Sequence, residues 1–249
     1  MECFPLRVRC GLKEGDSMRQ VIALGGGGFS MEPDNPLLDR YILSQSAARK
    51  PKVCFIPTAS GDAEGYIEGF RKAFSAFDCI PSHLALSRPP AADLEDYVLE
   101  KDILYVGGGD TVRMLETWRE HGLDRILRQA WEQVVLAGLS AGSMCWYEEG
   151  VNCDDDGQAN VVQGLGLIPG SHSPHYDSEP EYRRGYHELL RSGRIRAGVG
   201  VSDGAGIHYI GCRIHRVVGS RRDARIYGVE AFDGKVAETE MIPEYLGTL

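Results

Sequence analysis

The first half of the chain alternates short apolar runs with glycine-rich turns and amphipathic segments. Tyr66, Phe70 and Phe74 form one apolar stripe at helical spacing, and further helices are expected after Pro36 and around Leu115. The alternation predicts an α/β fold with a mostly parallel sheet flanked by helices on both faces. The apolar runs have the length and composition of buried strands, and they lie at 21–24, 53–56, 83–86, 103–106 and 134–137.

The last third of the chain is less regular but contains the same two kinds of segment. A helix is predicted from Pro180 to Ser192, and Gly193 ends it. No repeat or linker interrupts residues 18–249, so a single domain is predicted there, preceded by an N-terminal extension at 1–17. Further strands are expected at 198–201, 206–210, 214–218 and 224–229.

Composition limits the classes of function. Of the 249 residues, 43% are hydrophobic and 25% charged, as in an ordinary globular protein. The 27 basic and 36 acidic residues give a net charge of −9, which disfavours binding to nucleic acid or to an anionic membrane. No apolar run is long enough to span a bilayer, and no signal-peptide pattern opens the chain. With seven scattered cysteines and no Cys-x-x-Cys pair, a cytoplasmic protein with reduced thiols is expected.

The motif Gly138-x-Ser140-x-Gly142 follows the predicted strand at 134–137. A nucleophile on a tight turn between strand and helix needs small neighbours, because the backbone is strained and crowded. The N–H of Ala141, at the start of the next helix, could then stabilise an oxyanion. The alternative is an ordinary turn in which Ser140 caps the helix.

A second glycine-rich turn, ending in Asp110 and Thr111, follows the strand at 103–106. Because parallel strands end at one edge of a sheet, this turn is expected beside Ser140. The N–H groups of Gly108 and Gly109 are candidates to bind a substrate carbonyl, and Asp110 is a candidate substrate-binding residue. The alternative is a helix cap formed by Asp110 or Thr111.

A serine nucleophile requires a general base, and two of the seven histidines lie in a promising segment. His172 and His175 follow an apolar run and precede the predicted helix at 180–192. The His-x-x-His spacing could also bind a metal, but it is not the spacing of a helical zinc motif and Pro174 opposes a helix there. We therefore expect neither a metal nor an organic cofactor.

The residue that orients the histidine should be a carboxylate. Asp203 directly follows an apolar strand and stands beside small residues, although an aspartate before glycine is also common in turns. With Ser140 first, either histidine of this segment next and Asp203 last, the chain order would differ from the order serine, acid, histidine of an α/β-hydrolase esterase. The other candidate acids are Asp154, Asp155, Asp156, Asp177 and Glu179.

Taken together, these segments resemble the peptidase E (aspartyl dipeptidase) and cyanophycinase family of serine peptidases. The resemblance extends over roughly residues 18–230. It rests on the glycine run at 25–28, Ile56-Pro57-Thr58-Ala59, Val106-Gly107-Gly108-Gly109-Asp110-Thr111, Gly138-Leu139-Ser140-Ala141-Gly142, Pro174-His175-Tyr176 and Val201-Ser202-Asp203-Gly204.

The resemblance implies a fold like that of class I glutamine amidotransferases. The family's nucleophile falls on Ser140 and its histidine on His175, whereas its third residue, usually glutamate, falls on Asp203. Because aspartate is one methylene shorter, either its loop comes closer to the histidine or another acid takes the role. The glycine loop usually carries asparagine where this chain has Asp110, and the family's substrate-binding arginine falls near Arg183.

The implied activity is that of a serine exopeptidase acting on dipeptides or short peptides, with a preference for N-terminal aspartate. Cyanophycinase-like cleavage of β-aspartyl-arginine peptides and a non-catalytic binding protein remain alternatives. An amidotransferase-like enzyme would place cysteine at the turn, where this chain has Ser140, and Cys145 is expected to pack in the helix. A short peptide is the expected partner, and either a monomer or a homodimer fits the sequence.

Overall fold

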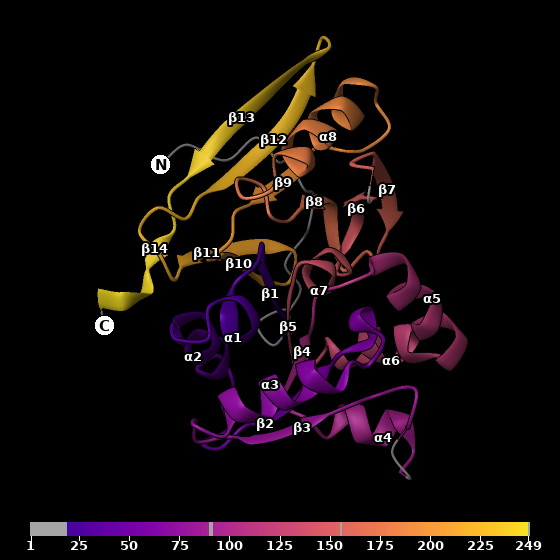
Figure 1. Cartoon of the computed structure of the whole chain (residues 1–249), viewed down its shortest axis with the longest axis vertical. Coiled ribbons are helices and arrows are strands. Elements are labelled where there is room, and N and C mark those ends of the chain that lie inside the picture. Colours follow the sequence, from indigo (N-terminus) through magenta and orange to yellow (C-terminus); the bar gives the residue numbers. More distant parts are fainter. Residues whose placement is uncertain (1–18, 90–91, 155, 249) are drawn as a thin grey trace.

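The computed structural model describes residues 19–89, 92–154 and 156–248, so the extension predicted at 1–17 lies outside the described residues. Within them, one sheet has eight strands in the order β14-β11-β10-β1-β5-β4-β2-β3 (Figure 1). The five neighbouring strands β1, β5, β4, β2 and β3 are parallel to one another. Strand β10 is antiparallel both to β1 and to β11. The strands are β1 Gln20–Leu24, β2 Lys52–Ile56, β3 Ile80–His83, β4 Ile103–Val106, β5 Val135–Leu139, β10 Ala205–Ile210, β11 Arg213–Gly219 and β14 Glu244–Tyr245.

Helices cover both faces of this sheet, which confirms the predicted fold class. Alternate strand residues point to opposite faces, so Ile22 packs in one apolar cluster and Val21 in another. One face is covered by α1 Gly28–Met31, α2 Leu37–Leu43 and α3 Glu64–Phe74. The other face is covered by α4 Leu94–Leu99, α5 Thr111–His121 and α6 Leu123–Ala130 (Figure 1).

A second sheet, which was not predicted, follows the turn at Ser140. Within the described residues it has six strands in the order β13-β12-β9-β8-β6-β7. Its strands β6, β7 and β13 carry many polar residues, so they lack the apolar runs that marked the first sheet. The elements are α7 Ala141–Met144, β6 Tyr147–Cys153, β7 Ala159–Gln163, β8 Ile168–Ser173, α8 Pro180–Arg191, β9 Gly198–Val201, β12 Ile226–Phe232 and β13 Lys235–Met241.

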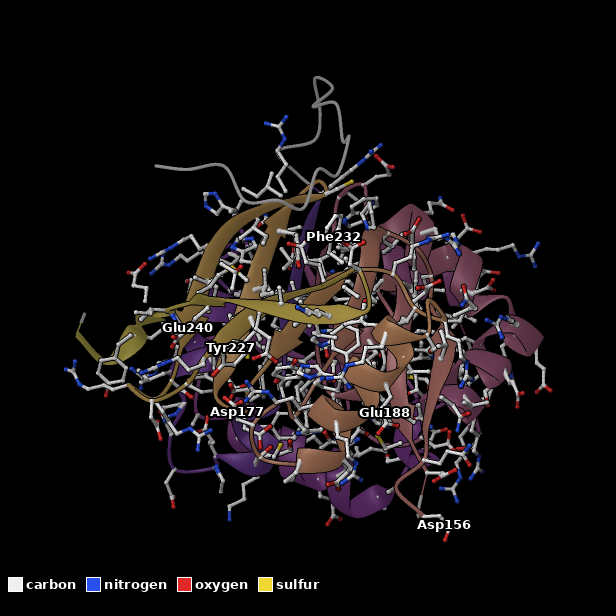
Figure 2. All side chains as sticks on the ribbon, turned by 90° about the horizontal axis from the view of Figure 1, so that it is seen from above. Asp156, Asp177, Glu188, Tyr227, Phe232 and Glu240 are labelled. Carbon is white, nitrogen blue, oxygen red and sulfur yellow. The ribbon has the colours of Figure 1, made fainter. Side chains whose placement is uncertain are left out.

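The two sheets share one core. Trp146 and Val199 of the second sheet's region belong to the same buried cluster as Val21 of the first. Helix α8 packs on the second sheet through Tyr186 and Leu189. The hairpin β12–β13 lies across α8, as Figure 2 shows from above. Two short 3₁₀ helices, Thr58–Ser60 and Leu246–Thr248, complete the described elements.

One predicted strand was misplaced. The run at 83–86 was expected to be a strand, but β3 spans Ile80–His83. Leu84 and Leu86 are buried in the core cluster outside the sheet, so their apolar character reflects burial and not strand pairing. Pro81 is tolerated within β3 because this strand lies at the edge of the sheet.

Helix α2 carries a buried carboxyl group that should make stability depend on pH. Asp39 is 1% exposed, and burial raises its pKa from 3.8 to about 7 against an opposing effect of the Tyr105 hydroxyl. Between these two values the folded chain keeps a proton that the unfolded chain has lost, so stability falls as pH rises. We expect this group to lower the free energy of unfolding by about 4 kcal/mol between pH 4 and 8.

Asp39→Asn removes this titration and should flatten the decline relative to wild type. Urea unfolding at pH 5 and pH 8 measures the difference. Asp34→Asn, at an exposed position of the same segment, is the control and should follow the wild type. An Asp39→Asn protein that loses stability with pH as steeply as the wild type would contradict the expectation.

Candidate active site

Ser140 lies in a strained turn between β5 and α7. Its backbone angles are φ 54° and ψ −119°, a combination that a residue with a side chain adopts at a cost in energy. A Cβ at position 138 would lie 2.1 Å from the Gly142 carbonyl oxygen, so glycine is required there. The Ser140 side chain makes no capping hydrogen bond to α7. These angles are compatible with a nucleophile turn, and the missing side-chain bond differs from the serine-capped helix considered as the alternative.

His175 lies just beyond β8 and faces a carboxylate. It is 7% exposed and has φ 51°, a second strained position. Its Nδ1 lies 2.7 Å from Asp203 Oδ1 and 3.9 Å from Glu179 Oε1. Asp177 instead accepts a hydrogen bond from Ser202 Oγ at 2.7 Å. Of the candidate acids, Asp203 is therefore the one in hydrogen-bonding contact with His175, whereas Asp154 accepts from the backbone of its own turn and Asp155 lies outside the described residues.

The shorter side chain of Asp203 reaches His175 because its loop lies against the glycine run after β1. Asp203 forms an isolated bridge with Gly26, and Gly204 N donates to Gly26 O at 3.0 Å. A Cβ on Gly26 would lie 2.1 Å from Asp203 Oδ1, so only glycine leaves space for the carboxylate. Burial would raise the pKa of Asp203, but hydrogen bonds from His175 and Ser178, with the charge of Arg221, hold this pKa below its ordinary value.

Ser140 Oγ and His175 are not hydrogen-bonded to each other in this structure. Among the described residues, no hydrogen bond joins them, and the ring of His175 is held by Asp203 alone at bonding distance. A contact between these two side chains therefore has to form during the reaction if Ser140 is the nucleophile and His175 its base.

The second candidate histidine has a different environment. His172 lies within β8 and is fully buried, with its ring stacked on Tyr147 at 4.7 Å between centroids. Burial lowers its pKa to about 3, so the ring is neutral at ordinary pH. Its Nε2 lies 2.8 Å from Ser143 Oγ, and it makes no contact with a carboxylate among the described residues. The geometry therefore favours His175 over His172 as the base.

Two backbone N–H groups in the turns that follow the paired strands β4 and β5 have no acceptor in the described part of the chain. Among the described residues, none accepts a hydrogen bond from the N–H of Gly109 or of Ala141. The N–H of Gly108 donates to the Tyr66 hydroxyl at 3.2 Å, a contact that sequence reasoning missed because Tyr66 was assigned to the apolar face of a helix. Asp110 caps α5, accepting from Arg113 N at 3.0 Å, as the alternative interpretation expected.

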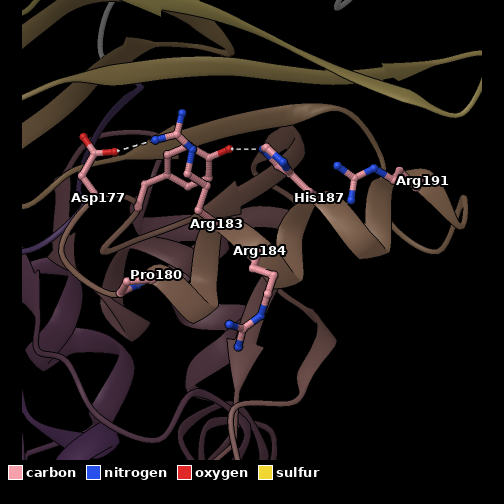
Figure 3. A pocket seen from close by; sticks show the side chains of 7 residues that line it. Asp177, Pro180, Arg183, Arg184, His187 and Arg191 are labelled. Carbon is pink, nitrogen blue, oxygen red and sulfur yellow. Dashed lines mark hydrogen bonds and ion pairs between the residues drawn. The ribbon is translucent and has the colours of Figure 1, made fainter.

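Arg183 is paired with carboxylates of the protein itself, and Figure 3 shows its contact with Asp177. Its guanidinium pairs with both oxygens of Glu238 and lies 3.3 Å from Asp177 Oδ1. The pocket that Arg183 lines with Tyr176, Asp177 and His187 includes none of Ser140, His175 and Asp203. The structure therefore gives no support to Arg183 as a free cation for a substrate carboxylate.

The described part of the chain contains no group of three or more histidine, cysteine, aspartate or glutamate side chains placed to hold a metal ion.

Cys145 lies one turn after Ser140 and is fully buried, and burial raises the pKa of its thiol well above the ordinary value. A protonated, buried thiol is a poor nucleophile. Cys145 thus packs in the core, as expected.

Comparison with known proteins places the chain in a family. The sequence profile described as "Peptidase family S51" matches residues 21–217. The chain belongs to peptidase family S51. It is 48% identical over 231 residues to "Uncharacterized peptidase YgaJ" of Bacillus subtilis (strain 168), covering 92% of this chain and 100% of that protein. A shorter match, 30% identical over 111 residues, is to "Uncharacterized peptidase PM1590" of Pasteurella multocida (strain Pm70), covering 43% of this chain and 54% of that protein.

Two solved structures of peptidases share the fold of this chain. A peptidase from an acI-B1 Actinobacterium superposes with a TM-score of 0.65 at 20% identity, covering 92% of this chain and 96% of that one. A putative peptidase E protein from Listeria monocytogenes EGD-e superposes with a TM-score of 0.58 at 20% identity, covering 81% and 97%. None of the helices described here has the length and apolar character needed to cross a membrane. The chain is a family S51 peptidase, and it shares its α/β fold with these solved structures.

Proposed function

We propose that this peptidase is a serine-type exopeptidase that hydrolyses dipeptides or short peptides through an acyl-enzyme on Ser140. The observation that carries the proposal is the 2.7 Å contact between His175 Nδ1 and Asp203 Oδ1 at the edge of the sheet that bears the strained Ser140 turn. A base oriented by a carboxylate, together with a nucleophile on a strained turn, is the arrangement that acyl transfer requires.

In the proposed reaction, Ser140 Oγ attacks the scissile carbonyl and His175 Nε2 takes its proton. Asp203 accepts the Nδ1–H, so it holds the ring in the required tautomer and stabilises its charged form. The N–H groups of Ala141 and Gly109 bind the oxyanion, which contributes about 3 kcal/mol for each donor. His175 then protonates the leaving amine, and a water molecule, activated by the same ring, releases the acyl group.

A covalent probe and a peptide panel together test this proposal. A fluorophosphonate should add one label per chain, and peptide mapping should place that label on Ser140. The panel should contain Asp-X and Ala-X dipeptides, longer peptides and β-Asp-Arg, the substrate class of the cyanophycinase alternative. A wild-type chain that is neither labelled nor active on any member would instead be a binding protein on this fold.

Removal of Arg183 tests the inferred basis of an aspartate preference. Because Glu238 and Asp177 already neutralise this guanidinium, Arg183→Ala should leave the ratio of kcat/KM for Asp-X over Ala-X within about twofold of wild type. It should lower Tm, because Glu238 loses its cation partner while its side chain is 19% exposed. A selective loss of Asp-X cleavage would restore Arg183 as the substrate-binding residue.

A further inference from the structure

A buried hydroxyl joins the Ser140 turn to the strand that leads to His175. Ser143 Oγ lies 2.7 Å from the Ser140 carbonyl oxygen and 2.8 Å from His172 Nε2. Ser143 lies on α7, three residues after Ser140, and His172 lies on β8, three residues before His175. Both side chains are fully buried. One residue of this contact is therefore close in sequence to the proposed nucleophile, and the other is close to the proposed base.

The hydrogen atoms of the contact can be placed so that both distances are hydrogen bonds. When the Ser143 hydroxyl donates its single hydrogen to the Ser140 carbonyl, its oxygen accepts from His172 Nε2–H. This placement requires His172 to be neutral with its hydrogen on Nε2, and full burial in an apolar environment keeps the ring uncharged.

The Ser140 carbonyl accepts one more hydrogen bond than the backbone of helix α7 provides. It accepts backbone hydrogen bonds from Ser143 N at 2.9 Å and Met144 N at 3.0 Å, and the Ser143 hydroxyl adds a third. A strained turn persists only when its surroundings fix it, and this carbonyl belongs to the residue with φ 54°.

The position of His172 is fixed from two further sides. Its ring stacks on Tyr147 with an interplanar angle of 12°, and the Tyr147 hydroxyl lies 2.9 Å from that of Tyr209. Its backbone lies in the middle of the second sheet, opposite Gly150 of β6 and Val199 of β9. The contact between Ser143 and His172 therefore connects the Ser140 turn to the middle of the second sheet.

We propose that Ser143 and His172 are positioning residues of the peptidase reaction, which hold the Ser140 turn in its reactive conformation and set its place relative to His175. The proposal rests on the proposed function, since it gives the pair a role only if Ser140 is the nucleophile. The competing explanation is that the two buried side chains only satisfy each other's hydrogen-bonding groups. In that case they contribute to stability and not to the reaction.

The test compares variants that break the pair with one that preserves it. Ser143→Ala and His172→Phe each remove one partner, whereas His172→Gln offers an amide N–H near the position of Nε2. We expect the first two to lower kcat and the rate of fluorophosphonate labelling about 10- to 100-fold with KM within about twofold, because small displacements of a nucleophile are costly. His172→Gln should recover most of the loss, and the double variant should lose no more than either single one.

Ser171→Ala is the matched control, because Ser171 is a fully buried serine on β8 whose hydroxyl contacts Tyr186 and Arg196 O and not the Ser140 turn. It should lower Tm without changing kcat or the labelling rate. Circular dichroism confirms that each variant is folded, and rates are measured at a temperature below its Tm. If Ser143→Ala and His172→Phe behave like Ser171→Ala, the positioning role is wrong. If wild-type Ser140 is not labelled, the proposed function itself has failed.

Discussion

Replacing Ser140 with Ala should reduce kcat by about 10⁶-fold on the best peptide of the panel and abolish labelling by a fluorophosphonate. Without Oγ no acyl-enzyme can form, and the remaining rate comes from the oxyanion donors and from substrate binding. KM should change little, because the backbone donors of Gly109 and Ala141 remain. The fold should also persist, since alanine retains the Cβ and the turn is held by backbone contacts of Ser140 with Leu24 and α7.

The control for this variant is a serine outside the site. Ser87 is exposed on the loop after β3, and Ser87→Ala should match the wild type in kcat and in labelling at Ser140. Initial rates with each dipeptide, together with intact mass after labelling, provide the measurement. Retention of full activity in Ser140→Ala would show that another group is the nucleophile.

Asp203→Asn should lower kcat by about 10⁴-fold with little change in KM. An asparagine amide can donate to Nδ1 and thereby leave the ring hydrogen on Nε2, so His175 could no longer accept the Ser140 proton. The pKa of Asp203 lies below its ordinary value, so the carboxylate stays ionised at every pH above about 4 and supports both activity and stability there. That stability contribution disappears only as pH falls through the lowered pKa.

Glu179→Gln is the matched control for Asp203→Asn. Glu179 Oε1 lies 3.9 Å from His175 Nδ1 and its side chain is 45% exposed, so its loss should change kcat by less than about twofold. Steady-state kinetics of the two variants on one substrate compares the acids directly. A large effect of Glu179→Gln with a small effect of Asp203→Asn would transfer the orienting role to Glu179.

The sequence by itself determined the fold class, most strands of the first sheet and the Ser140 turn. Both depend on local requirements: buried strands need short apolar runs, and the backbone of Gly142, which passes close to position 138, excludes any side chain there. For the same reason the motif around Ser140 and the strand before Asp203 could be recognised without coordinates. Family membership followed from the order of these local motifs along the chain.

Only the tertiary structure decided which side chains meet. It separated His175, which faces Asp203, from His172, which is buried beneath the Ser140 turn, although the two lie three residues apart. It also paired Arg183 with Glu238 of the hairpin β12–β13, 55 residues away, and so removed its free charge. The second sheet was missed because its half-polar strands are stabilised by pairing between distant segments. Such contacts depend on packing over the whole chain, and no local pattern of residues encodes them.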